Sequence, residues 1–223
     1  MPYTRLAPYY DLLGWADFTD YLWPHVKSFF RYIGGPPEEM LDIACGTGVL
    51  TVRLAEKSIK VTGIDINPEM IRIAKTKQYE TMPKFSVADM CDFDLKRTFP
   101  VTGCFYDAIN HLTDEKKVIR AFECAYRHTE EYGYYLFDVN TIKGLKNWAP
   151  FQSSRRDSFF VRQHGVFDPE TRMGAYKVEA FVKKFDGTVD FIEEVISEKG
   201  YKDSFLRLEI ARAGFTKILV KPF

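Results

Sequence analysis

The sequence has 223 residues, of which 46% are hydrophobic and 16% aromatic, so it can bury a substantial core as one domain. Its 31 Lys and Arg residues balance its 31 Asp and Glu residues, and this neutrality argues against recruitment to nucleic acid or membranes by overall charge. No apolar run approaches the roughly 20 residues of a membrane helix. The four cysteines lack CxxC spacing, and the N-terminus does not have the pattern of a signal peptide. We therefore expect a reduced, cytoplasmic protein without a structural metal, a disulfide framework or a membrane segment.

Residues 1–37 are rich in aromatic side chains and predict one or two helices, which form a helical cap that GGPP ends. Residues 38–150 then alternate short apolar strands with helices. The expected strands are 40–44, 60–65, 83–89, 101–107 and 133–140. The expected helices are 49–57, a helix that starts at Asn67-Pro68, and one between 114 and 127. Such alternation predicts a doubly wound, mostly parallel α/β sheet that forms the ligand-binding core.

Residues 151–200 break this alternation. Three strand-like stretches, 159–167, 174–185 and 188–196, follow one another without a helix, and Asp186-Gly187 predicts a hairpin turn. We expect an antiparallel β meander inserted into the core, serving as a substrate, lid or dimer region. Its exposed edge makes a homodimer possible.

Residues 201–223 are expected to complete the core. A helix is predicted with Asp203 as its N-cap and Gly214 at its end. FTKILVKPF (215–223) then predicts a last strand.

The stretch LDIACGTG (41–48) closes the first strand with a glycine turn that opens a helix. Such a turn presents main-chain N–H groups to a ligand, and open parallel sheets bind ligands beyond the carboxyl ends of their strands. Thr51 stands where the dinucleotide fingerprint has its third glycine, and no Gly-Lys-Ser/Thr follows the turn. Neither a complete dinucleotide motif nor a phosphate loop is present.

Acidic residues lie in or after each of the first three strands: Asp42, Asp65 and Asp89. Asp65 follows Gly46 by 65 − 46 = 19 positions and can accept hydrogen bonds from both ribose hydroxyls, which would also suit a dinucleotide. Asp89 can accept from an adenine amine, and the N–H of Met90 can donate to a ring nitrogen. Because the glycine turn has no basic residue, these acids favour a ligand with ribose, adenine and a cationic centre but no phosphate.

LDIACGTG, GIDINPEMI (63–71) and VADM (87–90) resemble, in order and spacing, the motifs of class I S-adenosylmethionine-dependent methyltransferases, over roughly residues 38–142. CFYDAINHL (104–112) and LFDVN (136–140) are similar to motifs of small soluble bacterial-type members. The resemblance implies a Rossmann-like fold, S-adenosyl-L-methionine as cofactor, and in-line transfer of a methyl group to nitrogen or oxygen of a small-molecule substrate. The family fold usually ends with a sixth strand and an antiparallel seventh, and since this sequence stops after FTKILVKPF, we expect the seventh strand to be either absent or supplied by another segment.

The resemblance also implies roles for individual residues. Asp42 would orient the glycine turn, whose backbone would lie along the methionine portion of the cofactor. Asp65 would bind the ribose and Ile66 would pack on the adenine. The residues implied to bind the cofactor are Asp42, Ala44, Cys45, Gly46, Gly48, Asp65, Ile66, Asp89, Met90 and Phe105.

Three residues are candidates for catalysis: Tyr10, Tyr106 and His111. An imidazole titrates near working pH, but His111 could equally flank the next helix start without a catalytic role. Tyr10 could close over the ligand or simply pack. Asp138 and Asn140 are expected at the mouth of the pocket, either contacting substrate or capping a turn.

Other functions remain open. A tRNA- or RNA-modifying methyltransferase predicts a basic surface, and the neutral composition therefore disfavours nucleic acid as a partner. An NAD-dependent oxidoreductase is disfavoured by Thr51 and Asp89. A sensor that binds the cofactor without catalysis is a further alternative. The Asn/Asp-Pro-Pro-Tyr motif is absent from the fourth strand, which disfavours amide or nucleobase methylation of that kind.

Overall fold

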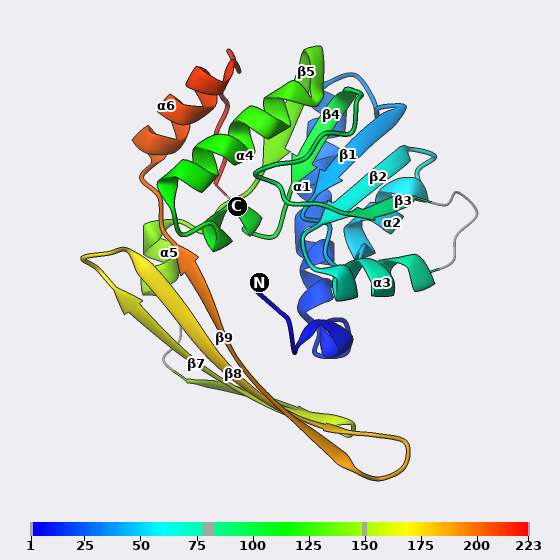
Figure 1. Cartoon of the computed structure of the whole chain (residues 1–223), viewed down its shortest axis with the longest axis vertical. Coiled ribbons are helices and arrows are strands. Elements are labelled where there is room, and N and C mark those ends of the chain that lie inside the picture. Colours follow the sequence, from blue (N-terminus) through cyan, green and yellow to red (C-terminus); the bar gives the residue numbers. More distant parts are fainter. Residues whose placement is uncertain (1, 78–82, 149–150, 223) are drawn as a thin grey trace.

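The computed structural model describes residues 2–77, 83–148 and 151–222. They form a parallel sheet of five strands in the order β3-β2-β1-β4-β5 and an antiparallel sheet of four strands in the order β6-β7-β8-β9. Figure 1 shows the antiparallel sheet extending away from the parallel body, with the N-terminal segment between them.

The predicted doubly wound α/β body is confirmed. Its strands are β1 (Glu39–Ile43), β2 (Lys60–Asp65), β3 (Lys84–Val87), β4 (Phe99–Cys104) and β5 (Thr129–Phe137). The helices between them are α2 (Val49–Ala55), α3 (Pro68–Thr76) and α4 (Glu115–Arg127), with the 3₁₀ turn η3 (Ala108–His111) before α4. Because every pairing in this sheet is parallel, the carboxyl ends of all five strands meet at one edge.

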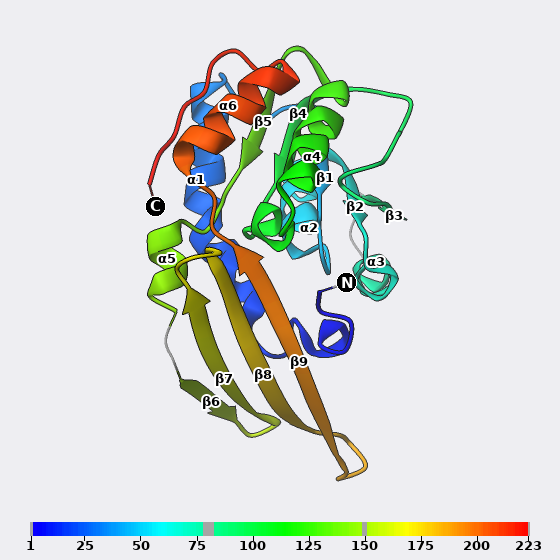
Figure 2. The same ribbon diagram turned by 60° about the vertical axis from the view of Figure 1, so that its left-hand side comes forward.

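Helices cover both faces of the sheet (Figure 2). On one face, α1 (Phe18–Tyr32) and α2 pack on β1 and β4. On the other face, α4 and α6 (Asp203–Ala213) enclose a second core. Side chains at helical spacing, such as Val118 and Phe122 of α4, are fully buried, and this burial holds each helix in place.

The first half of the predicted helical cap is not a regular helix. Residues 7–17 form two 3₁₀ turns, η1 (Ala7–Tyr9) and η2 (Trp15–Asp17), separated by Gly14 with φ 85°. Leu6 packs against the inserted sheet, and Tyr9 and Leu13 lie against the same cluster. Apolar side chains at helical spacing therefore serve tertiary packing here rather than one helix face. The second predicted helix is present as α1.

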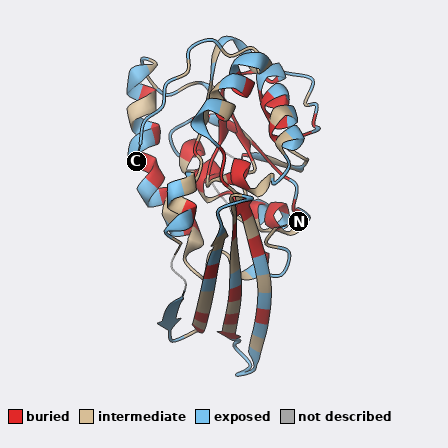
Figure 3. Ribbon diagram, turned by 90° about the vertical axis from the view of Figure 1, so that its left-hand side faces the viewer, coloured by how far each residue is buried: buried red, intermediate tan, exposed pale blue. Residues whose placement is uncertain are grey.

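The predicted antiparallel meander is confirmed as β7 (Phe159–Asp168), β8 (Met173–Lys183) and β9 (Val189–Lys199). Buried and exposed residues alternate along its strands (Figure 3), because successive side chains point to opposite faces. Two elements were not predicted: β6 (Gln152–Arg156), a fully exposed polar edge strand, and the short helix α5 (Ile142–Lys146), which precedes it.

The last strand predicted from FTKILVKPF is wrong for the residues that the structure describes. Residues 215–222 form no strand and follow α6, whose C-cap is Gly214 as predicted. Phe215 instead packs its ring on Tyr126 of α4 and Tyr135 of β5, with ring centroids 5.2 and 5.5 Å apart. Alternating apolar residues make a strand only where another strand offers hydrogen bonds, and here packing on α4 takes precedence.

The predicted N-cap of α6 is also wrong by one position. Lys202 occupies the cap without a side-chain hydrogen bond, and Asp203 is the first helical residue. A carboxylate in the first turn still interacts favourably with the positive end of the helix. Among the helices formed by the described segments, none has the length and apolar character needed to span a bilayer.

Candidate cofactor and acceptor site

The glycine turn after β1 has left-handed backbone at three positions: Ala44 (φ 58°), Gly46 (φ 55°) and Gly48 (φ 76°). A Cβ at Gly48 would lie 2.9 Å from the Phe85 ring and 3.1 Å from Ala74, so this glycine lets α2 approach β3 and α3. A Cβ at Gly46 would meet no atom within 4 Å, so the turn presents bare main chain to open space. These features fit a ligand that lies along the backbone.

Two buried carboxylates fix the turn and the helix after it. Asp65 accepts hydrogen bonds from the main-chain N–H groups of Gly46 at 2.9 Å and Asn67 at 2.8 Å. Asp42 accepts the hydroxyl of Thr51 at 2.5 Å. The role implied for Asp42 is thereby corrected: Asp65 orients the glycine turn, and Asp42 holds the start of α2. Thr51, which stands in place of the third glycine, supplies this hydroxyl.

A narrow cavity lies at the carboxyl ends of β1 and β4, where the strand order reverses direction. It is lined by Tyr10, Ala16, Asp42, Ala44, Cys45, Gly46, Thr47, Val49, Leu50, Phe105 and Tyr106. Half of the residues predicted to bind cofactor line it, together with two of the three predicted catalytic residues. Doubly wound sheets bind ligands at this position.

The other predicted cofactor residues lie along the same edge but outside the lining of this cavity. Asp65 and Ile66 follow β2, and the Ile66 side chain is 37% exposed. Asp89 and Met90 follow β3, where Asp89 accepts the N–H of Cys91 at 2.8 Å. Their roles in binding the ribose and adenine stay predictions.

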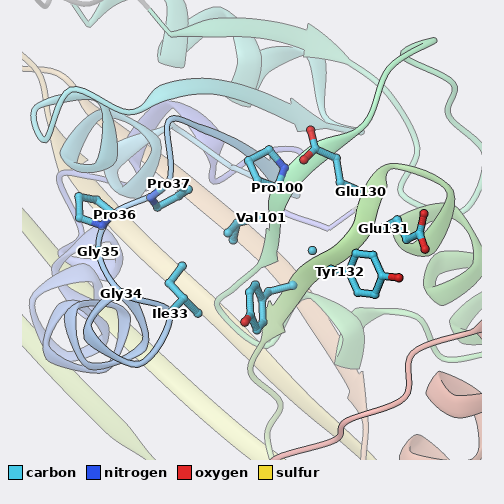
Figure 4. A pocket seen from close by; sticks show the side chains of 12 residues that line it. Ile33, Gly34, Gly35, Pro36, Pro37, Pro100, Val101, Glu130, Glu131 and Tyr132 are labelled. Carbon is cyan, nitrogen blue, oxygen red and sulfur yellow. The ribbon is translucent and has the colours of Figure 1, made fainter.

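A larger depression lies at the opposite end of the parallel strands (Figure 4). It is lined by residues 33–37, Pro100, Val101 and residues 130–134, which belong to the loop after α1 and the amino ends of β4 and β5. Ligands of parallel sheets bind at the carboxyl ends. We therefore place the functional site at the smaller cavity beside the glycine turn.

The turn after β4 is strained. Tyr106 and Asp107 both have left-handed backbone, with φ of 61° and 48°, which is uncommon for residues other than glycine. Asp138 at the end of β5 accepts the N–H of Asp107 at 3.0 Å. The Tyr106 hydroxyl contacts the Thr19 hydroxyl and donates to the carbonyl of Ala16 at 3.1 Å. These contacts fix the Tyr106 ring as a wall of the cavity, and its catalytic role stays a prediction.

Three carboxylates, Asp107, Asp138 and Glu198, come from the ends of β4, β5 and β9, and we call them the acid cluster. Asn140 joins two of them: its side-chain NH₂ donates to Asp107 at 2.6 Å and to Glu198 at 2.9 Å. Burial, reinforced by the neighbouring carboxylates, raises the pKa of Asp107 and of Glu198. Burial also raises the pKa of Asp138 to about 6.

His111 from η3 faces the acid cluster. Its Nδ1 lies 3.3 Å from the carbonyl oxygen of Ser197, which can only accept, so we assign the ring proton to Nδ1. Nε2 is then an acceptor, 4.0 Å from Asp107 Oδ1 and 3.5 Å from the Tyr3 hydroxyl. Burial lowers the pKa of His111 and favours the neutral ring. A neutral imidazole with an available lone pair is the state that a general base requires.

Aromatic rings of the N-terminal segment cover this region. Tyr10 lies edge-on to Tyr3 and Trp15, with ring centroids 5.3 and 5.4 Å apart, and Tyr3 lies 5.5 Å from His111. The structure thus brings the predicted Tyr10 and His111 into one cluster through Tyr3. Glu194 of β9 anchors the segment by accepting the main-chain N–H groups of residues 4–6.

Sequence reasoning missed Tyr3 and Glu198. The signal for Glu198 is the alternation of β9, in which Ile192, Ile196 and Glu198 share one parity and all three are buried. A carboxylate at a buried position of a strand is rare unless a specific interaction holds it. No comparable signal marks Tyr3, whose position depends on packing across the chain.

We expect the free energy of unfolding to rise as pH falls from 8 to 6. Burial raises the pKa of Asp42 to about 7 and of Asp138 to about 6, above their unfolded values, so the folded state takes up protons that the unfolded state does not. Burial lowers the pKa of His111, so the unfolded state protonates this ring more readily than the folded state does. This difference opposes the gain in stability as the pH falls toward 6. The net gain should be about 1–2 kcal/mol by urea titration of cofactor-free protein. A loss of stability over this range would contradict the assignment.

Comparison with known proteins agrees with the parallel fold and the glycine turn described above. A family model for a methyltransferase domain matches residues 40–133. The chain is 27% identical to a putative methyltransferase of Geobacillus sp. (strain WCH70), over 97% of this chain and 90% of that protein. These matches identify an S-adenosylmethionine-dependent methyltransferase. This methyltransferase therefore uses S-adenosyl-L-methionine as its cofactor, as predicted.

Two further comparisons place this methyltransferase among proteins of related fold and sequence. A crystal structure of an S-adenosylmethionine-dependent methyltransferase from Clostridium acetobutylicum has a TM-score of 0.77 at 23% identity, covering 95% of this chain and 87% of that one. The dTDP-3-amino-3,6-dideoxy-alpha-D-glucopyranose N,N-dimethyltransferase of Streptomyces fradiae is 32% identical over 53% of this chain and 47% of that protein. The first shares the Rossmann-like fold, and the second aligns with about half of the methyltransferase.

Proposed function

We propose that this methyltransferase transfers a methyl group to a nitrogen or oxygen atom of a small molecule. The observation that carries the proposal is that Tyr106, which lines the cavity beside the glycine turn, is followed directly by Asp107 of the acid cluster. Cofactor and acceptor would thus bind side by side under the N-terminal segment. The relative from S. fradiae, named for an amino-sugar nucleotide, supports a small-molecule acceptor.

The cofactor would be held by the residues around the glycine turn. Residues 44–47 line the cavity, and Asp65 already orients the turn through the N–H of Gly46. Each oxygen of Asp65 can accept a second hydrogen bond, so the carboxylate can bind ribose hydroxyls without releasing the turn. We assign Ile66, Asp89 and Met90 to the adenine. When bound, the cofactor supplies a methyl group already activated on a sulfonium.

The chain's own residues would align the acceptor, exclude water and receive a proton. Alignment in a closed pocket contributes about 7–11 kcal/mol in favourable cases. We assign His111 as the base, which would add roughly 10²–10⁴-fold. Tyr10 and Tyr106 would serve as walls that keep water from the reacting atoms.

Calorimetry tests the proposal most directly. S-adenosylmethionine and S-adenosylhomocysteine should each bind the folded protein with one site, whereas NAD should not. Incubation with methyl-labelled cofactor and libraries of small amines, alcohols and phenols should then transfer label. Label transfer to tRNA but to no small molecule would contradict the proposal.

Asp11 is expected to slow release of the cofactor. Its carboxylate accepts the hydroxyl of Thr47 in the glycine turn at 2.6 Å and pairs with Lys77 at 2.7 Å, which ties the N-terminal segment to the turn. Asp11→Ala should raise the dissociation rate of S-adenosylhomocysteine about tenfold, as expected for loss of about 1.4 kcal/mol. Stopped-flow fluorescence of the nearby Trp15 measures the rate.

Asp20→Ala is the matched control. Asp20 pairs with Arg53 on the surface of α1, and its side chain is 78% exposed. Such pairs contribute little, so the control should release the ligand at the unchanged rate. Equal rates for the two variants would show that Asp11 does not restrain the segment.

We also propose that the protein works in the cytoplasm. All four cysteines (Cys45, Cys91, Cys104 and Cys124) are free thiols, which suits a reducing compartment.

A further inference from the structure

We propose that the acceptor of this methyltransferase is an amine, bound as its ammonium cation between Asp107, His111 and Glu198. The inference rests on the proposed function and narrows it from nitrogen or oxygen acceptors to amines. It assigns Glu198, which comes from the inserted sheet, to the acceptor site.

The acid cluster lacks a compensating cation. Among the described residues, no lysine or arginine forms an ion pair with Asp107, Asp138 or Glu198. The nearby Lys199 pairs with Glu115 instead. Asp138 and Glu198 are buried, and the Asp107 side chain is 30% exposed. Buried carboxylates without a cationic partner are costly, so this cluster requires either protons or a bound cation.

The atoms that face one another around the site are all acceptors. Asn140 donates to Asp107 Oδ2 and Glu198 Oε2, and the carbonyl of Ser197 fixes His111 with Nε2 as an acceptor, whose contact with the Tyr3 hydroxyl is long, at 3.5 Å. One acceptor atom from each of Asp107, His111 and Glu198 lies within 4.8 Å of the others. Three acceptors converging on one point match the three N–H donors of a primary ammonium group.

The spacing favours an ammonium over a metal ion. His111 Nε2 and Asp107 Oδ1 are 4.0 Å apart, so a metal at about 2.1–2.2 Å from each would have to bind them at an angle of about 130–145°. That is far from tetrahedral or octahedral geometry. A nitrogen about 2.8 Å from the same two atoms subtends about 90°, which ammonium N–H groups can meet with nearly straight hydrogen bonds.

Two independent features point to the same ligand. Asp138 is 8% exposed, and its Oδ1 has no hydrogen-bond partner within the described part of the chain, although its other oxygen holds the turn at Asp107. This uncompensated oxygen adds negative charge beside the site. Tyr3, Tyr10 and Trp15 lie edge-on to one another next to His111, and aromatic faces stabilise alkylammonium groups.

The site also accounts for the proton that must leave before methylation. One N–H bond of the ammonium breaks, the proton passes to Nε2 of His111, and the electron pair stays on nitrogen as the attacking lone pair. The acid cluster stabilises the imidazolium that results, as carboxylates do for other catalytic histidines. Since the methylated product is again an ammonium, the same residues bind it.

The test compares cyclohexylamine, which is cationic at pH 7.5, with its neutral counterpart cyclohexanol. Each is titrated into protein loaded with S-adenosylhomocysteine, and the NMR signals of the Asn140 side-chain amide and the His111 ring are followed. Cyclohexylamine should bind and shift both signals, and cyclohexanol should not. Glu198→Gln and Asp107→Asn should each weaken cyclohexylamine binding at least tenfold and leave the affinity for S-adenosylhomocysteine unchanged.

Glu193→Gln is the control, because Glu193 lies on the same strand but pairs with Lys177 at the surface. It should bind cyclohexylamine as the unmodified protein does. The proposal is overturned if cyclohexanol binds equally well, if cyclohexylamine shifts neither signal, or if stoichiometric Mn²⁺ broadens both signals while the amine does not. Thermal unfolding identifies whether Glu198→Gln or Asp107→Asn fails to fold, and the variant that does fold then tests the proposal. Failure to bind S-adenosylhomocysteine at all would instead contradict the proposed function.

Discussion

Asp65→Ala is expected to weaken the binding of S-adenosylmethionine at least tenfold and to destabilise the fold as well. A hydrogen bond from a ligand to a charged acceptor contributes about 1.5–3 kcal/mol, which the variant loses at the ribose. The carboxylate also accepts the main-chain N–H groups of Gly46 and Asn67. Without it both donors are left unpaired, so the glycine turn loses the geometry that faces the ligand, and the free energy of unfolding falls by about 1–3 kcal/mol.

Calorimetry measures the affinity, and urea unfolding measures the stability. Glu38→Ala provides the matched control: Glu38 is an exposed carboxylate at the amino end of the same sheet, paired with Lys60. It should change neither quantity appreciably. If Asp65→Ala binds the cofactor as tightly as the control does, the assignment of the ribose site is wrong.

Asp138→Ala should lower the free energy of unfolding by about 2–4 kcal/mol, since a buried donor left unpaired costs about 1–3 kcal/mol. Asp138 accepts main-chain N–H groups of Tyr106 and Asp107, two residues with left-handed backbone. Such conformations persist only where neighbouring contacts enforce them. Loss of the carboxylate should therefore release the turn and move the Tyr106 ring out of the cavity wall.

Asp138→Asn separates hydrogen bonding from charge. The amide keeps one acceptor oxygen for the turn and removes a buried carboxylate whose Oδ1 has no partner. We expect it to lose less than half the stability that Asp138→Ala loses, by urea unfolding of both variants. Equal losses would show that charge, rather than the hydrogen bonds to the turn, determines the contribution of Asp138.

The core of the site was predictable because its signals are local. Gly46 and Gly48 mark a left-handed turn within a few residues, and the Asn67-Pro68 cap is confirmed by hydrogen bonds from the Asn67 side chain to Glu69 and Met70. Alternating strands and helices predict parallel pairing, which brings the strand ends to one edge without further information. The family motifs cover this same part of the chain.

What could not be predicted depends on partners distant in the sequence. Residues 215–222 have the pattern of a strand, but they pair with no strand among the described segments. Leu6 has helical spacing with Tyr9, yet it is buried against the inserted sheet. Asp42 was expected to orient the glycine turn, and only the structure shows that the hydrogen bond comes from Asp65. Sequence spacing predicts which carboxylates lie near a site, but it does not predict the donor from which each carboxylate accepts a hydrogen bond.

The anchoring of residues 4–6 by Glu194 sets the order in which the molecule can assemble. These contacts join positions separated by 188–190 residues, so they form only after β9 has been synthesised. Loop closure over such a distance is slow compared with local helix and turn formation. A nascent chain that ends before β9 can already have its glycine turn, but the aromatic wall over it is completed last. We expect hydrogen exchange during refolding to protect β1 and α2 well before the N–H groups of Thr4 and Leu6.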